Sequence, residues 1–133
     1  ATTPAEVLLA LPMLQVGQIK DTMHAYQLAK RCNEKRSMAE SVKWGERGAR
    51  INAIAPGIIV TPLAIDEFNG PRGDFYKNTF AKCPAGRPGT SDEVANVAEL
   101  LMSEKGAFIT GSTFLIDGGA TSSYYYGSLK PGK

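Results

Sequence analysis

The sequence predicts an α/β fold, because helical and strand-like segments follow one another along the chain. Residues from Asp21 to about Trp44 contain no internal glycine or proline, which is typical of a long helix. The stretch from Arg50 to Ala55 is short, largely apolar and closed by Pro56-Gly57, as expected of a buried strand that ends in a turn. A second amphipathic helix and a second apolar strand follow, so helix and strand alternate.

The first 20 residues are predicted to form a connection that precedes the long helix. Thr3-Pro4-Ala5-Glu6 has the pattern of a capping box with proline at the first helical position, which predicts a short helix ending before Pro12. Residues 13–20 mix glutamine, glycine and aliphatic residues without a clear period, and we interpret them as a linker. Asp21 or Thr22 can then cap the long helix.

Two residues of the long helix form a candidate acid/base pair. Tyr26 and Lys30 are four residues apart, so on a helix they project from one face and lie one turn from each other. At that separation a lysine ammonium can act on a phenol. A Tyr-x-x-x-Lys pair also occurs as two solvated side chains on an exposed face, and the pair alone leaves both interpretations open.

The second half of the chain is predicted to contain a covering segment, a helix and a strand. Residues 64–88 lack a clean period and are too long for a plain connection, which favours a substrate-covering segment with a helical piece at Asp74 to Lys82. Thr90 and Glu93 form a capping box before an amphipathic helix that reaches Met102. Ser112 to Ile116 is a second predicted strand.

Composition excludes several classes of function. The chain has 133 residues, a net charge of +2 and no run of like charges, so a nucleic-acid partner is not expected. Its two cysteines, Cys32 and Cys83, are far apart and His24 is the sole histidine, so no metal site is expected. No apolar stretch has the length to span a membrane. Two cysteines are too few for a disulfide framework, so we interpret both as reduced. We therefore expect a soluble, cytoplasmic protein.

Several short motifs occur in a fixed order from Ala25 to Gly119, and together they are far more specific than any one of them. They are Tyr26-x-x-x-Lys30, Arg50-Ile51-Asn52-Ala53-Ile54-Ala55-Pro56-Gly57, Thr61-Pro62, Gly86-Arg87-Pro88-Gly89, Asp92-Glu93-Val94-Ala95, Ile109-Thr110-Gly111 and Asp117-Gly118-Gly119. This ordered set resembles the C-terminal half of the short-chain dehydrogenase/reductases.

The resemblance implies a fold and a division of the chain. The fold would be the C-terminal part of a doubly wound, parallel Rossmann-type sheet that binds NAD or NADP, with the N-terminal dinucleotide-binding half missing. Residues 1–133 would then be one partial domain. Within it, residues 1–20 would be an insertion or connection, residues 21–119 the catalytic helix, two strands and substrate loop, and residues 120–133 a surface tail.

The resemblance also implies roles for individual residues. Tyr26 would be the catalytic acid/base, while Lys30 would hold the cofactor ribose and lower the pKa of the tyrosine. Both residues would also contact the bound cofactor. Four residues after the first strand would border the nicotinamide and the cofactor phosphates: Pro56, Gly57, Ile59 and Thr61. Asn52 lies in the matching strand, and we interpret it as satisfying backbone groups near the sheet rather than taking part in the reaction.

The sequence lacks two features of the family pattern, the catalytic serine and the glycine-rich turn. The family's catalytic serine usually precedes the tyrosine by about a dozen residues, but Leu11 to Leu14 contain none, so we expect the serine upstream of Ala1. The glycine-rich phosphate-binding turn is also missing. We therefore expect a fragment of an oxidoreductase that acts on a small-molecule alcohol or carbonyl and associates as a homo-oligomer or with its own N-terminal half. The alternative is a non-catalytic remnant that serves as an interaction or scaffold module.

Overall fold

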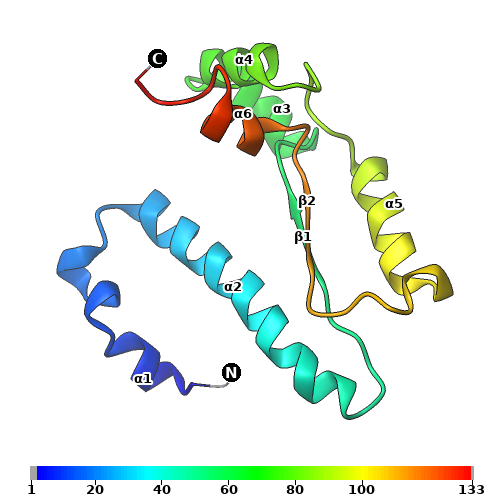
Figure 1. The fold of residues 1–133 in the computed structure, drawn as a ribbon. Coiled ribbons are helices and arrows are strands. Elements are labelled where there is room, and N and C mark those ends of the chain that lie inside the picture. The colour runs from blue at the N-terminus through cyan, green and yellow to red at the C-terminus, as the bar shows by residue number, and fades with distance from the viewer. Residues whose placement is uncertain (1–2, 133) are drawn as a thin grey trace. The chain divides into compact units, whose positions relative to one another are not determined.

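The chain forms two structural units in the computed structural model, which describes residues 3–132 (Figure 1). Of the described residues, the first unit comprises 3–53 with 109–113, and the second comprises 54–108 with 114–132. Helices and two parallel strands alternate along the chain, so the predicted α/β class is confirmed.

The first unit is built around α2, Thr22–Gly45, a helix of 24 residues. The Asp21 carboxylate caps its start by accepting a hydrogen bond of 2.7 Å from the His24 backbone N–H. Gly48, with a φ of 70°, turns the chain just after the helix ends. The helix that the sequence predicts from Asp21 to about Trp44 is therefore confirmed.

The segment before α2 contains a short helix α1, Ala5–Leu9, and the 3-10 turns η1, Pro12–Leu14, and η2, Val16–Gln18. The predicted capping box at Thr3 is wrong. Pro4 occupies the N-cap position of α1, so the helix begins one residue later than the pattern requires and no side-chain hydrogen bond caps it.

The two strands, β1, Ala53–Pro56, and β2, Thr113–Ile116, form a two-stranded sheet (Figure 1). The Ala53 N–H donates to the Ser112 carbonyl at 2.9 Å, and the Gly57 N–H donates to the Ile116 carbonyl at 3.1 Å. The partner residues advance together along both strands, so the pairing is parallel. Parallel neighbours need a long crossover, and residues 57–112 provide it.

The crossover begins with a helical hairpin formed by α3, Pro62–Asn69, and α4, Gly73–Lys82. The Phe68 ring lies edge-on to the rings of Tyr76 and Phe80, with centroids 5.1 and 5.3 Å away. The Tyr76 hydroxyl also donates a hydrogen bond to the Glu67 carboxylate. Helix α4 confirms the helical piece predicted at Asp74 to Lys82. Helix α3 was not predicted, although a Thr61 cap followed by Pro62 is a helix-start signal.

Three more helical segments complete the second unit: α5, Ser91–Met102, the 3-10 turn η3, Glu104–Gly106, and α6, Ala120–Tyr126. The capping box predicted at Thr90 and Glu93 is confirmed. Helix α6 occupies the first half of the predicted surface tail and lies beside α4 (Figure 1). Within residues 3–132, no helix combines the length and the apolar character that crossing a membrane requires.

Candidate active-site helix and cofactor-side segment

Tyr26 and Lys30 lie together on α2, one helical turn apart. The Lys30 Nζ atom is 5.3 Å from the centroid of the Tyr26 ring. This contact follows from the four-residue spacing, because side chains at i and i+4 share one face of a helix. Tyr26 is 58% exposed and Lys30 is also exposed, so both side chains are accessible to a ligand.

The C-terminal half of α2 is fixed within the first unit by a close contact with Gly111. A Cβ atom on Gly111 would lie 2.7 Å from the Ser41 Oγ atom, and the φ of Gly111 is 69°. Glycine is therefore required at this position for two reasons, the close approach of the helix and the left-handed backbone. The loop around Gly111 thus positions the helix that carries Tyr26 and Lys30.

Asn52 joins the same loop to the chain that enters β1. Its Nδ2 atom donates to the Ile109 carbonyl at 2.9 Å, and its Oδ1 atom accepts from the Ser112 N–H at 3.1 Å. Both ends of the amide are bonded to backbone groups, which confirms the structural interpretation of Asn52. Arg50 donates to the same Ile109 carbonyl at 3.3 Å.

The other four predicted site residues, Pro56, Gly57, Ile59 and Thr61, follow one another at the end of β1. A Cβ atom on Gly57 would lie 2.7 Å from the Cα and Cβ atoms of Asp117, so the backbone passes too close for a side chain. Ile59 forms a parallel bridge with Gly89. Thr61 Oγ1 accepts a 3.1 Å hydrogen bond from the Ala64 N–H and so caps α3.

The structure therefore brings the predicted residues together in two sets. Tyr26 and Lys30 form one set in the first unit, while residues 56–61 form another set in the second unit.

Asp117 also lies in this region, although the sequence placed it only in the Asp117-Gly118-Gly119 motif and predicted no role for it. Its carboxylate accepts hydrogen bonds from the Gly119 N–H at 2.9 Å and the Thr121 N–H at 2.7 Å. Partial burial works to raise the pKa of Asp117, but these hydrogen bonds outweigh it and hold that pKa below its ordinary value. The Asp-Gly-Gly motif was the available signal, since an aspartate before two glycines suits a cap on the following turn.

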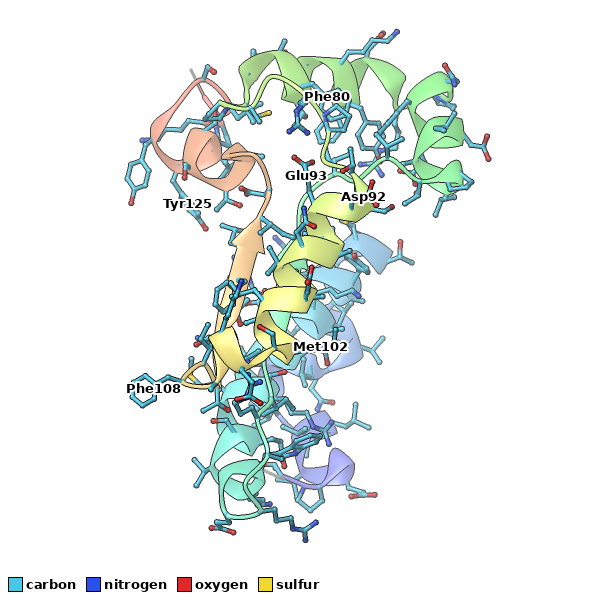
Figure 2. The ribbon with its side chains drawn as sticks, turned by 90° about the vertical axis from the view of Figure 1, so that its right-hand side faces the viewer. Phe80, Asp92, Glu93, Met102, Phe108 and Tyr125 are labelled. Carbon is cyan, nitrogen blue, oxygen red and sulfur yellow. The ribbon has the colours of Figure 1, made fainter. Side chains whose placement is uncertain are left out.

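An ion pair covers the N-terminus of α5, where Figure 2 shows Glu93 in the first turn. Arg87 holds the Glu93 carboxylate with two hydrogen bonds of 2.9 and 2.6 Å. The same carboxylate accepts from the Thr90 N–H at 2.9 Å. The hydrogen bonds from Arg87 and Thr90 lower the pKa of Glu93 to about 2.

The ion pair forms one wall of a pocket of about 230 Å³ in the second unit. Apolar side chains line much of the rest, including Ile58, Val94 and Ile116, and Asp117 lies at its edge. Arg87 and Glu93 neutralise each other, so the charge that the pocket lining retains is the carboxylate of Asp117. Within residues 3–132, no group of three or more histidine, cysteine, aspartate or glutamate residues is placed to hold a metal ion.

Comparison with known proteins identifies the family. Residues 7–121 match the family model described as enoyl-(acyl carrier protein) reductase. The chain is 39% identical over 119 residues to the short-chain dehydrogenase/reductase bsc3 of Alternaria brassicicola, which covers 90% of this chain and 43% of that protein. It is 41% identical over 81 residues to the D-threitol dehydrogenase of Mycolicibacterium smegmatis, covering 61% of this chain and 30% of that protein.

Solved structures agree with this assignment. A 4-hydroxyisoleucine dehydrogenase complexed with NADH matches with a TM-score of 0.65 and 29% identity, over 74% of this chain and 40% of that one. The TT0495 protein from Thermus thermophilus matches with a TM-score of 0.67 and 28% identity, over 74% of this chain and 40% of that one. The chain thus spans less than half the length of these relatives, and it belongs to the short-chain dehydrogenase/reductase family.

Proposed function

We propose that the chain is the catalytic and substrate-binding part of an NAD(P)-dependent oxidoreductase that interconverts an alcohol and a carbonyl compound. The single observation that carries the proposal is the Tyr26–Lys30 pair, with Nζ 5.3 Å from the phenol ring on an accessible face of α2. Family membership supports it, because the relatives from Alternaria brassicicola and Mycolicibacterium smegmatis and the solved 4-hydroxyisoleucine dehydrogenase are named as dehydrogenases or reductases.

Tyr26 is the proposed proton donor and acceptor. Reducing a carbonyl adds a hydride to carbon and a proton to oxygen, and oxidising the alcohol removes both. The Tyr26 hydroxyl gives its proton to the carbonyl oxygen in the first direction and takes the alcohol proton in the second. Tyr26 is 58% exposed, so a substrate can approach this side chain.

Lys30 is the proposed partner that allows the Tyr26 phenol both to lose its proton and to take it back. When Tyr26 has lost its proton, the nearby Lys30 ammonium stabilises the resulting phenolate by charge attraction. The same ammonium can hold the ribose hydroxyls of the cofactor through its three N–H donors. One residue therefore serves both the proton transfer and the binding of the dinucleotide.

The residues that follow β1 fit a nicotinamide dinucleotide chemically. Pro56 and Gly57 have small side chains or none, and the backbone at Gly57 already lies close to Asp117. Ile59 offers an apolar surface to a flat ring. Thr61 stands at the N-terminus of α3, where backbone N–H groups and the helix dipole favour a phosphate. The dinucleotide, when bound, supplies or accepts the hydride.

The α3–α4 hairpin is the proposed cover of the substrate. It follows Thr61 directly, and its exposed Phe75 and Leu63 offer apolar surface to a ligand. Loops and hairpins in this role exclude water and set substrate preference. A cytoplasmic location and a homo-oligomeric state stay predictions from the sequence.

The proposal is tested by a coupled absorbance assay on the complete enzyme that contains this chain. NADH and NADPH are each offered with a panel of aldehydes and ketones, and NAD and NADP with the matching alcohols. We expect turnover with one cofactor and at least one substrate class. If the complete enzyme binds the cofactor but turns over no substrate in the panel, the result favours the alternative of a non-catalytic interaction module.

A further inference from the structure

The last carbonyl of α4 is held by two hydroxyl groups from the C-terminal segment. Ser123 Oγ donates to the Lys82 carbonyl at 2.8 Å, and Ser128 Oγ donates to the same oxygen at 3.3 Å. Carbonyls in the last turn of a helix lack an intrahelical partner, so an outside donor is needed here. Ser123 is 6% exposed, whereas Ser122 and Tyr124 on either side of it in α6 are exposed.

The chain that leaves α4 is also packed tightly against the start of α6. The Ala85 N–H donates to the Gly118 carbonyl at 2.9 Å. A Cβ atom on Gly118 would lie 2.8 Å from Ala85 Cβ, and one on Gly119 would lie 2.6 Å from Pro84 Cγ. Both glycines also have positive φ values, 63° and 84°. This crossing therefore has no space for a side chain on either glycine.

The α3–α4 hairpin is held together internally by different contacts. Glu67 bonds Tyr76, and Phe68 stacks edge-on with Phe80, so the two helices form one packed body. Gly73 is buried at the start of α4, where a Cβ atom would collide with the Phe68 carbonyl. A hairpin of this kind moves as a unit, and its motion is then controlled at its two ends.

We propose that Ser123 is a positioning residue that holds the C-terminal end of the α3–α4 hairpin and so limits its opening over the substrate. The inference rests on the proposed function, which makes this hairpin the substrate cover. Ser128 supports the same carbonyl through a longer hydrogen bond and contributes less. Helix α6 lies beside α4 and would act on the hairpin through this contact (Figure 1).

The test compares Ser123→Ala with Ser122→Ala, a matched control one residue earlier on the same helix. Both changes remove one hydroxyl and raise helix propensity equally, but Ser122 is exposed. Amide hydrogen exchange is measured across α4 and α5 in the complete enzyme. For Ser123→Ala we expect exchange in α4 to be about five- to tenfold faster, with α5 within about twofold of wild type. Ser128→Ala should give a smaller increase in α4.

Two exchange results would overturn the proposal. One is exchange in α4 that stays within about twofold of the Ser122→Ala control. The other is an equal increase in α4 and α5, which would mean general destabilisation rather than release of the hairpin.

Kinetics separate this proposal from the proposed function. In an active enzyme, Ser123→Ala should raise KM for the substrate severalfold and leave KM for the cofactor within about twofold. A substrate KM that matches the control would contradict the positioning role, even if dehydrogenase activity is intact. If no activity is found in any variant while α4 exchange still rises, the proposed function fails and the contact of Ser123 with α4 stands.

Discussion

The Nζ atom of Lys30 lies 5.3 Å from the centre of the Tyr26 ring, on the same face of α2. In the complete enzyme, Tyr26→Phe should therefore lower kcat by about 10²–10⁴-fold, because it removes the proton that the phenol is proposed to transfer. Cofactor affinity should stay within a few fold, since the phenol is not the cofactor's main contact. Steady-state kinetics and a fluorescence titration with the dinucleotide check both parts.

Tyr124→Phe is the matched control for this change, since Tyr124 is a similarly exposed tyrosine at 50%. It should leave kcat unchanged. Lys30→Ala, in contrast, should damage both turnover and cofactor affinity. A Tyr26→Phe enzyme that keeps more than about a tenth of the wild-type rate would show that Tyr26 is not the acid/base.

Local patterns in the sequence predicted the helices that carry the site, because their signals lie within a few residues. Asp21 caps α2, and Thr90 with Glu93 caps α5, as the patterns indicate. The first strand was predicted from Arg50, but β1 begins at Ala53. Before that point Ile51 already accepts a hydrogen bond from the Gly111 N–H, so the pairing extends beyond the strand proper.

Contacts between distant residues could not be predicted in the same way. Helix α6 is rich in serine and tyrosine, which are weak helix formers, and it depends on the Asp117 cap and on Ser123 reaching Lys82, 41 residues away. The close approach of Gly57 to Asp117 likewise joins the residues that directly follow two separate strands. Neither the hydrophobic period of a segment nor a local motif predicts such a contact.

Gly57→Ala should destabilise the protein, because the added methyl would lie 2.7 Å from the Asp117 backbone. Backbone atoms cannot rotate away as a flexible side chain can, so we expect a loss of about 1–3 kcal/mol in the free energy of unfolding. Cofactor affinity should fall as well, since Gly57 lies in the segment proposed to border the nicotinamide. Urea denaturation and a cofactor titration measure the two effects.

Gly45→Ala is the control for this substitution. A Cβ atom at Gly45 would meet nothing within 4 Å, and the residue ends α2 without a positive φ. The change should be neutral or slightly stabilising, as expected for alanine in place of a helical glycine. Equal losses of stability in both variants would rule out the contact with Asp117 as the cause.

The stability of the protein should depend on pH through Glu93. Hydrogen bonds from Arg87 and Thr90 lower its pKa from an ordinary 4.5 to about 2. A lowered folded-state pKa stabilises the fold above the unfolded value, so this contribution is present above about pH 4.5 and is lost as the pH falls through about 2. The ion pair is exposed, so salt should weaken the effect.

Glu93→Gln tests this contribution while keeping an oxygen that can accept from the Thr90 N–H. Urea denaturation between about pH 6 and pH 2 should show a shallower loss of stability in this variant than in wild type. Asp92→Asn removes one carboxylate from the same helical turn, next to Glu93 in Figure 2, and leaves the Arg87 pair intact. If Asp92→Asn flattens the pH profile as much as Glu93→Gln, the Arg87 pair is not its source.

The final prediction concerns the free edge of β1. Within residues 3–132, β1 pairs with β2 alone, so its other edge presents unpaired N–H and C=O groups. Buried apolar side chains are also few in that range, comprising Tyr76, Cys83 and Leu101, while Leu115 on β2 is 55% exposed. Two strands with so small a core rarely persist alone in water.

Association can cover that edge, so the 133-residue chain should form a dimer or higher oligomer, or persist only beside another chain that pairs with this strand. It should also fail to bind a nicotinamide dinucleotide appreciably, because its sequence has no glycine-rich turn to hold the pyrophosphate. Light scattering and a cofactor titration test the two parts separately. A stable monomer would contradict the edge argument. Micromolar binding of NAD or NADP would show that residues 56–61, with Lys30, are sufficient to hold the cofactor.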